Sequence, residues 1–202
     1  LLNILQEYKH SLQQIYKFEI ICSRIIKEFK YPFLRHILNS AGIVRFPQAQ
    51  FDMVRAGIGL YGIHFCEAEQ SKLHNVSKLK SCISQIKQIP ANESIGYGRS
   101  IITSKNTTIA VIPVGYADGL NRNLSNGKGK IWVKGKLVPI IGKICMDMCM
   151  IDITGLNCCE GDEVIIFGEE YTITELAKTI GTIPYEVLTS VSRRVKRVYF
   201  QE

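Results

Sequence analysis

Apolar side chains recur three or four positions apart over the first part of the chain. This spacing predicts one helix over residues 1 to about 30. The next stretch, "YPFLRHILNSAG", predicts a loop entering a short buried strand that ends at Asn39-Ser40, and a second buried strand is expected around Met53 to Tyr61. A helix followed by two buried strands is typical of a parallel α/β unit. The helical positions are Leu5, Tyr8, Leu12, Ile15, Phe18, Ile25 and Phe29.

The pattern changes after about residue 70, where polar and apolar side chains begin to alternate. Segments such as "NTTIAVIPVGYADG", "GKIWVKGKLVPIIGK" and "GDEVIIFG" are separated by glycine-containing turns. We therefore expect an α/β part over residues 1–68 and a mostly β domain, a small barrel or sandwich, over residues 69–202. Two late helices are expected in it: "TITELAKTIG", with Thr172 or Thr174 as N-cap and Gly181 as its end, and "PYEVLTSVS", which starts at Pro184.

The formal net charge is +7, from 25 basic and 18 acidic residues, and the basic residues are scattered. Their densest cluster, "SRRVKRVYF", is interpreted as a strand with basic residues on its solvent side. Nucleic-acid binding would need a basic stripe with interleaved aromatic residues, which is absent, whereas a bound phosphate suits the charge equally well. The sequence has no signal peptide and no apolar run of membrane-spanning length, so we expect a cytoplasmic protein that does not enter a membrane.

Seven cysteines raise the question of a metal site or of disulfides. Cys145 and Cys149 have C-x-x-x-C spacing but lack a second pair or a nearby histidine, so no metal site is expected. Reduced thiols that act as small apolar residues explain the cysteines more simply.

The stretch "GIGLYG" places Gly57, Gly59 and Gly62 in the G-x-G-x-x-G spacing of a dinucleotide-binding turn. Such a turn must open a helix, because the pyrophosphate binds the free backbone N–H groups of the helix start. The residues that follow show no sustained helical spacing, and no acidic residue lies between Glu69 and Glu93 to bind a ribose. These glycines therefore need another explanation.

Four stretches, taken together, resemble the second half of alanine racemase. They are "HILNSAGIVRFPQAQFDMVRAGIGLYG", "SIGYGRSIITSKNTTIAVIPVGYADGLNR", "PIIGKICMDMCMIDIT" and "PYEVLTSVSRRVKRVY". The resemblance implies the last strands of a pyridoxal-phosphate-binding (β/α)8 barrel, followed by a mostly β C-terminal domain. It runs from about residue 30 to the end of the chain.

The resemblance implies where the cofactor binds. Backbone N–H groups of Gly57 and Ile58 would bind its phosphate, with the hydroxyls of Ser40 and Tyr185. A side chain at Gly57 would keep the backbone away from the phosphate oxygens. Arg55 would face the pyridine nitrogen and, because arginine keeps its proton, would leave the ring a weaker electron sink. Outside the family, Arg55 would be a salt-bridge residue and Ser40 a polar cap at a strand end.

The resemblance also implies the acid/base and substrate groups. Racemisation needs proton transfer on both faces of Cα, and the family uses a cofactor lysine on one face and a tyrosine, here Tyr97, on the other. In the family each β domain supplies this tyrosine to the barrel of its homodimer partner. Tyr116 would line the substrate entrance, and the backbone N–H of Met146 would bind the substrate carboxylate, with Asp147 next in the loop. The alternatives are an exposed aromatic for Tyr97, packing for Met146 and a turn hydrogen bond for Asp147.

One family feature has no counterpart in the sequence. The cofactor lysine belongs to a motif close to "VKANAYGHG", and nothing similar occurs. The chain also begins inside a helical pattern without methionine, so we expect the C-terminal piece of a racemase, or of a racemase–ligase fusion, that is inactive alone. Smaller departures are Ala56, where proline is common, and Lys143, where arginine is common.

Three functions follow from these observations. The leading hypothesis is the pyridoxal-phosphate-dependent interconversion of L- and D-alanine, which supplies D-alanine for bacterial peptidoglycan. A racemase of another amino acid keeps the fold and changes the substrate. A non-catalytic β module for dimerisation or docking would have no use for Ser40, Arg55, Gly57 and Tyr97 together, which counts against it.

Overall fold

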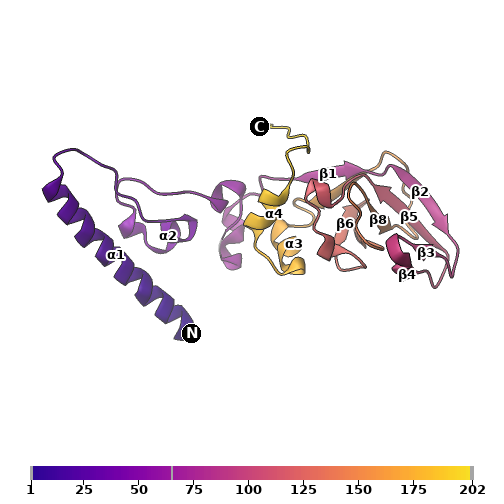
Figure 1. Ribbon diagram of the computed structural model, residues 1–202, viewed down its shortest axis with the longest axis horizontal. Helices are drawn as coiled ribbons and strands as arrows, with labels where there is room; N and C mark the ends of the chain where they lie inside the picture. Colours follow the sequence, from indigo (N-terminus) through magenta and orange to yellow (C-terminus); the bar gives the residue numbers. More distant parts are fainter. Residues whose placement is uncertain (1, 65, 201–202) are drawn as a thin grey trace. The chain divides into compact units, whose positions relative to one another are not determined.

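A computed structural model describes residues 2–64 and 66–200 of the chain and divides it into two compact units, Leu1–His74 and Asn75–Glu202 (Figure 1). The boundary expected from the change in hydrophobic pattern, at residue 68, precedes this division by a few residues. No helix among the described residues is both long and apolar enough to cross a membrane.

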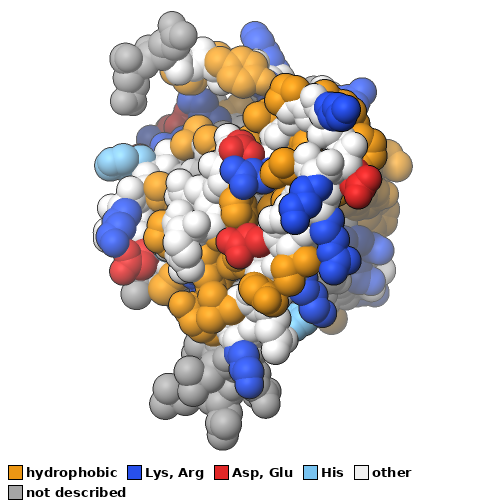
Figure 2. Space-filling model, turned by 90° about the vertical axis from the view of Figure 1, so that its left-hand side faces the viewer, with side chains coloured by type: hydrophobic (Ala, Val, Ile, Leu, Met, Phe, Trp, Pro, Cys, Tyr) orange, Lys and Arg blue, Asp and Glu red, His pale blue; other side chains and the backbone are white. Residues whose placement is uncertain are grey.

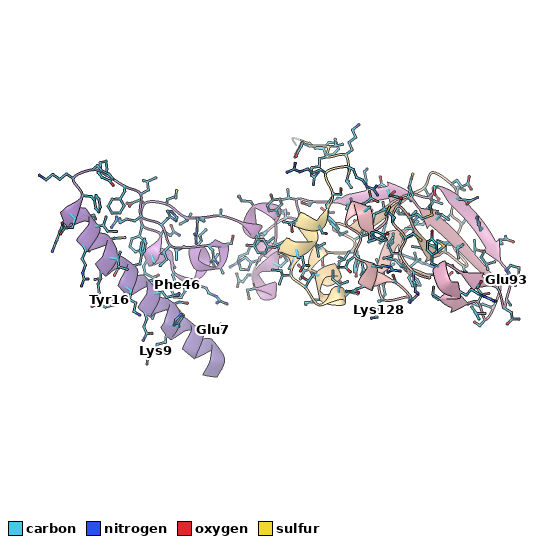
Figure 3. The ribbon with its side chains drawn as sticks, viewed as in Figure 1. Glu7, Lys9, Tyr16, Phe46, Glu93 and Lys128 are labelled. Carbon is cyan, nitrogen blue, oxygen red and sulfur yellow. The ribbon has the colours of Figure 1, made fainter. Side chains whose placement is uncertain are left out.

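The first unit is organised by one long helix, α1 (Leu2–Glu28), as the helical spacing predicted. Tyr8 and Phe18 of this helix contact Phe46 and Phe51, with ring centroids 5.1 and 5.3 Å apart respectively. Figure 3 labels Phe46 and, on α1, Tyr16. Leu38, Phe46 and Ala49 form the buried centre of the unit. The remaining elements are the short helix α2 (Ser40–Arg45) and the 3-10 helices η1 (Pro47–Ala49), η2 (Ile58–Tyr61) and η3 (Glu67–Lys72).

The two strands expected in this unit do not form as strands. Residues 31–39 and 50–57 carry no assigned strand, and Ile58–Tyr61 is a 3-10 helix. The two segments nevertheless run parallel, because Asp52 N–H donates to Arg35 O (3.2 Å) and Arg55 N–H donates to Leu38 O (3.0 Å). A strand requires a repeated ladder of such bonds, and two bonds three residues apart do not make one. The strand prediction was therefore wrong, although the direction of the segments matches a parallel unit.

The second unit is mostly β, as the alternating pattern predicted, and every strand pairing in it is antiparallel. One sheet has the order β1-β9-β6-β7, another β2-β5-β8, and a third joins β3 to β4. The strands are β1 (Leu79–Cys82), β2 (Gln85–Ile89), β3 (Ser94–Ile95), β4 (Ile101–Ile102), β5 (Thr107–Ile112), β6 (Lys130–Val133), β7 (Lys136–Pro139), β8 (Cys149–Asp152) and β9 (Glu163–Phe167).

β-Branched side chains fill the core of this unit. They stand on alternate positions of β6 and on consecutive positions of β9, so β9 is buried on both faces. The fully buried members include Ile112, Ile131, Val133, Ile140, Ile151, Val164 and Ile166. Between the strands lie three 3-10 helices: η4 (Tyr97–Arg99), η5 (Tyr116–Asp118) and η6 (Arg122–Leu124).

Both late helices form where the sequence predicted them (Figure 1). In α3 (Ile173–Ile180), Thr172 is the N-cap: its hydroxyl accepts from Glu175 N–H, and Glu175 accepts in return from Thr172 N–H. Gly181 ends the helix in a left-handed conformation. The second helix, α4 (Pro184–Ser190), starts at Pro184, which lacks the N–H that a first helical residue would leave unpaired.

Candidate functional site

Four of the residues assigned to the cofactor lie close together in the first unit. Ser40 begins α2, directly after Asn39, whose side chain caps the helix by accepting from Gly42 N–H. Gly57 N–H donates to the Ser40 hydroxyl at 2.8 Å. Ile58 follows as the buried first residue of η2, and Arg55 precedes Gly57 on the same segment. The structure thus joins a hydroxyl and a backbone amide, the two donor types that bind a phosphate.

Arg55 is held by main-chain atoms. Its backbone N–H donates to Leu38 O, and its guanidinium donates to Ile37 O at 3.3 Å. The side chain lines a hollow of about 240 Å³, together with Asn39 and residues of α1. Arg35 and Asp52, on the neighbouring segments, form an ion pair at 2.7 Å. Hydrogen bonds from Arg35 lower the pKa of Asp52 to about 2.

Sequence reasoning did not single out His36, a half-buried histidine on the segment that precedes α2. His36 precedes Ile37, and its Nδ1 atom is buried without a hydrogen-bond partner among the described residues. A buried polar atom without a partner is costly, so it marks a place where the first unit, taken by itself, leaves hydrogen-bonding capacity unused.

The glycine fingerprint does not form a dinucleotide-binding turn. The residues after Gly57 form only the four-residue helix η2, and Gly62 ends it with φ of 75°. So short a helix offers no extended helix start for a pyrophosphate. This stretch therefore lacks the helix that a dinucleotide-binding turn would open.

Large apolar side chains remain exposed on the first unit. Figure 2 shows them among lysines and arginines on the face turned to the viewer. On and beside α1 they include Tyr8, Leu12, Tyr16, Ile21, Ile26, Phe29, Tyr31 and Leu34. So many exposed apolar groups on one small unit are typical of a surface that other protein covers.

Tyr97 stands on a loop of the second unit that projects its ring into solvent. The side chain is 70% exposed. Gly96 (φ 78°, ψ 179°) and Gly98 (φ 68°) flank it, and L-residues rarely adopt either conformation. The loop lies close to Lys143, because a Cβ placed on Gly98 would lie 3.7 Å from Lys143 Nζ. The glycines thus let the loop present the phenol outward.

Tyr116 and Met146 lie on two segments that touch each other. Tyr116 N–H donates to Cys145 O, and Ala117 N–H donates to Met146 O, both at 3.0 Å. Gly115 makes this approach possible, because a Cβ there would lie 2.2 Å from Met146 O. Both Tyr116 and Met146 keep about half of their side-chain surface exposed. The predicted entrance and carboxylate-binding residues are therefore brought together.

The carboxylate of Asp147 forms an ion pair with an arginine. Arg194 donates through one terminal nitrogen to Asp147 Oδ1 and through Nε to Asp118 Oδ1, each at 2.7 Å. Burial raises the pKa of Asp118, but hydrogen bonds from Arg194 and Gly115 N–H outweigh burial, so the pKa lies below its usual range. Bonds to Asp118 and Asp147 likewise raise the pKa of Arg194.

Sequence reasoning missed Arg194. The cluster "SRRVKRVYF" was interpreted as a strand with its basic residues on the solvent side. The strand was wrong, because residues 191–200 form turns and irregular backbone, but the basic residues are exposed as predicted. The signal available was the cluster itself, but its acidic partners lie 76 and 47 residues away in the sequence.

The remaining predicted residue, Tyr185, lies in α4 of the second unit, where its main-chain carbonyl accepts from the Thr189 hydroxyl at 2.9 Å. Residues assigned to the site are thus divided: Ser40, Arg55, Gly57 and Ile58 belong to the first unit, and the others to the second. Among residues 2–64 and 66–200, no three His, Cys, Asp or Glu side chains gather as a metal-binding group.

Comparison with known proteins identifies the family. Residues 5–65 match the family described as alanine racemase, N-terminal domain, and residues 76–199 match alanine racemase, C-terminal domain. The chain belongs to the alanine racemase family.

Individual relatives agree with this. "Alanine racemase 1" of Caldanaerobacter subterraneus subsp. tengcongensis is 44% identical over 198 residues, which is 94% of this chain and 50% of the relative. "Alanine racemase 1" of Clostridium acetobutylicum is 42% identical over 204 residues, 97% of this chain and 52% of the relative. The chain thus spans about half the length of the curated relatives it matches.

Solved structures also match. The alanine racemase of Clostridium difficile 630, in complex with cycloserine, has a TM-score of 0.85 at 38% identity, covering 93% of this chain and 51% of that one. The alanine racemase of Bartonella henselae, with covalently bound pyridoxal phosphate, has a TM-score of 0.82 at 33% identity, covering 95% and 52%.

Proposed function

We propose that this chain forms the C-terminal half of a pyridoxal-phosphate-dependent racemase that interconverts L- and D-alanine. The observation that carries the proposal is the pairing of the Ser40 hydroxyl with Gly57 N–H at 2.8 Å, two residues after Arg55. Family membership of both units supports it.

The residues present fit the phosphate and the ring of the cofactor. The Ser40 hydroxyl and the Gly57 N–H, which donates to it in this structure, lie at one point. Ile58 follows directly in the chain, and Tyr185 would add a hydroxyl. The Arg55 guanidinium is a donor that does not give up its proton, as a partner for an unprotonated ring nitrogen must be. The aldehyde end has no counterpart here, because no lysine of this chain matches the family motif.

Tyr97 would transfer a proton at Cα of the amino acid. Pyridoxal phosphate, when bound, supplies the electron sink that makes this proton acidic. The outward-facing phenol of Tyr97 would serve one face of Cα as the base toward L-alanine. The opposite face needs the cofactor lysine, which this chain lacks, so we expect no racemisation from the chain by itself.

The substrate would lie between Tyr116 and Met146. The backbone N–H of Met146 would bind the carboxylate, and Tyr116 would line the way in. Tyr97, Tyr116 and Met146 all belong to the second unit. In a homodimer, the second unit of one subunit would therefore bring all three residues together to the site of its partner. The product would be D-alanine for bacterial peptidoglycan, made in the cytoplasm.

Two other functions compete with this one. A racemase of another amino acid would use the same cofactor residues with a different pocket. A non-catalytic β module would bind a partner through its exposed side chains. The Ser40–Gly57 pairing next to Arg55 favours either racemase over the module, because docking needs no phosphate-binding corner.

A chimeric protein tests the proposal. In this chimera, the half of the Clostridium difficile racemase that matches this chain would be replaced by this chain, and the N-terminal half of that racemase would be kept. The chimera would be loaded with pyridoxal phosphate and assayed with L-alanine. Racemisation by the chimera, lost on Gly57→Val but kept on Gly59→Ala, is the expected result, because a Cβ at Gly59 meets nothing within 4 Å. Racemisation of serine or lysine in preference to alanine would establish the second function. A folded, cofactor-loaded chimera inactive on every amino acid would refute both racemases.

A further inference from the structure

Arg194 joins three segments of the second unit at one point. Besides its bonds to Asp118 and Asp147, the segment that carries it is fixed by Ser192 N–H, which donates to Asp118 O at 3.0 Å. Asp118 belongs to the turn that holds Tyr116, and Asp147 follows Met146 directly. Both carboxylates that Arg194 binds therefore adjoin residues assigned to the substrate.

The two carboxylates differ in their surroundings. The Asp118 side chain is 13% exposed, and its other oxygen accepts from Gly115 N–H at 2.8 Å, so it is built into the turn. The Asp147 side chain is 56% exposed. Its contact with Arg194 is therefore not needed to satisfy a buried charge and by itself contributes little to stability.

The contact between Arg194 and Asp147 changes the electrostatic potential at the Met146 amide. A carboxylate on the next residue lies within about 7 Å of the Met146 amide, by the spacing of consecutive residues alone. An unpaired negative charge at that distance would repel a substrate carboxylate approaching the same amide. Arg194 both cancels this charge and holds the Asp147 side chain in one orientation.

We propose, on the basis of the proposed function, that Arg194 is a positioning residue that keeps Asp147 neutralised and turned toward itself, so that the Met146 N–H donates to a substrate carboxylate. Asp147 then does not bind substrate; it would oppose substrate binding if Arg194 were lost. Arg194 acts through Asp147 and touches no reacting atom.

The test measures carboxylate binding at the Met146 amide directly, without cofactor or turnover. The chain has four methionines, so labelling with ¹⁵N-methionine gives four backbone amide signals, at Met53, Met146, Met148 and Met150. The probe is sodium propionate, a carboxylate of the size of alanine, titrated at constant ionic strength. Propionamide, its neutral analogue, is the control ligand.

Propionate, but not propionamide, is expected to shift the Met146 signal. Arg194→Met should weaken this binding about fivefold to tenfold, the size expected for one nearby partly screened charge. Arg194→Met combined with Asp147→Asn should restore the affinity to within about twofold of the original chain. Arg193→Met, which removes the same charge from the exposed neighbouring arginine, should leave the affinity unchanged.

Asp147→Asn alone keeps the test decisive if Arg194→Met does not fold. It should bind propionate at least as tightly as the original chain, whereas a substrate-binding Asp147 would make it weaker. The Met150 signal, from strand β8, reports folding of every variant. A purely structural role for Arg194 would shift the Met150 signal and would not be rescued by Asp147→Asn.

Three results would overturn the proposal: a Met146 signal unmoved by propionate, an Arg194→Met variant that binds as well as the original chain, or a double variant without recovery. These outcomes are separate from the fate of the proposed function. An active chimera with no Arg194 effect would refute the positioning role alone. An inactive chimera with the expected titrations would refute the racemase alone.

Discussion

Gly115 is expected to tolerate substitution poorly, and the reason is space. Its backbone is extended (φ −133°), so alanine would cause no conformational strain. The added Cβ, however, would lie 2.2 Å from Met146 O and 2.4 Å from Cys145 O, both backbone atoms. Ordinary contact therefore requires these two segments to move apart by more than about 1 Å, since carbon contacts are normally about 3.5 Å.

The cost follows from what that movement breaks. Overpacking of this kind costs about 1–3 kcal/mol. The Tyr116–Cys145 and Ala117–Met146 hydrogen bonds would stretch from 3.0 Å, at roughly 1 kcal/mol each. The expected total is about 3–5 kcal/mol, a large part of the roughly 5–15 kcal/mol by which a domain is stable. A melting temperature lower by roughly 10–20 °C should result.

Urea unfolding of the chain, followed by circular dichroism, measures this difference. Gly155→Ala is the matched control, because Gly155 has φ of 78° but a Cβ there meets nothing within 4 Å. That variant carries backbone strain without a clash and should lose only about 1–2 kcal/mol. Equal losses for the two variants would refute the steric reasoning and with it the close contact between the Tyr116 and Met146 segments.

Two further predictions concern stability. Thr172→Ala removes the hydroxyl that caps α3, so it should cost about 1 kcal/mol in urea unfolding, while Thr172→Ser should cost clearly less; equal costs would show that the cap does not matter. Burial raises the pKa of the Cys149 thiol to about 12. The thiol of the unfolded chain has a pKa of about 8.5. The free energy of unfolding should therefore fall as the pH rises from there toward 12, by roughly 1–2 kcal/mol at pH 10. Cys149→Ala should remove this part of the alkaline loss, and an unchanged pH dependence would contradict the burial argument.

The hydrophobic pattern was sufficient where structure depends on neighbours in the sequence. The spacing along α1, the cap of α3 and the proline that opens α4 each act within a few residues. The first and third were predicted, and the cap was narrowed to Thr172 or Thr174, of which the structure has Thr172.

The pattern failed where structure depends on distant partners. Residues 35–38 and 52–55 have the composition of buried strands, but a parallel strand needs a ladder of partners, and the first unit provides two bonds. Arg194 was missed for the same reason: its carboxylates come from turns far away in the sequence, and charge patterning does not reveal such pairs. The site residues themselves followed from the family resemblance and not from periodicity.

The central claim is that Tyr97 transfers the proton on one face of the substrate. It is tested most directly by Tyr97→Phe in the chimeric racemase, incubated separately with L- and D-alanine in deuterated water, with Tyr16→Phe as an exposed tyrosine control. We expect Tyr97→Phe to exchange the Cα hydrogen of D-alanine without inverting it, and to leave L-alanine unexchanged, because only the lysine face remains active. Racemisation and exchange of L-alanine at rates near those of the Tyr16→Phe control would contradict the claim.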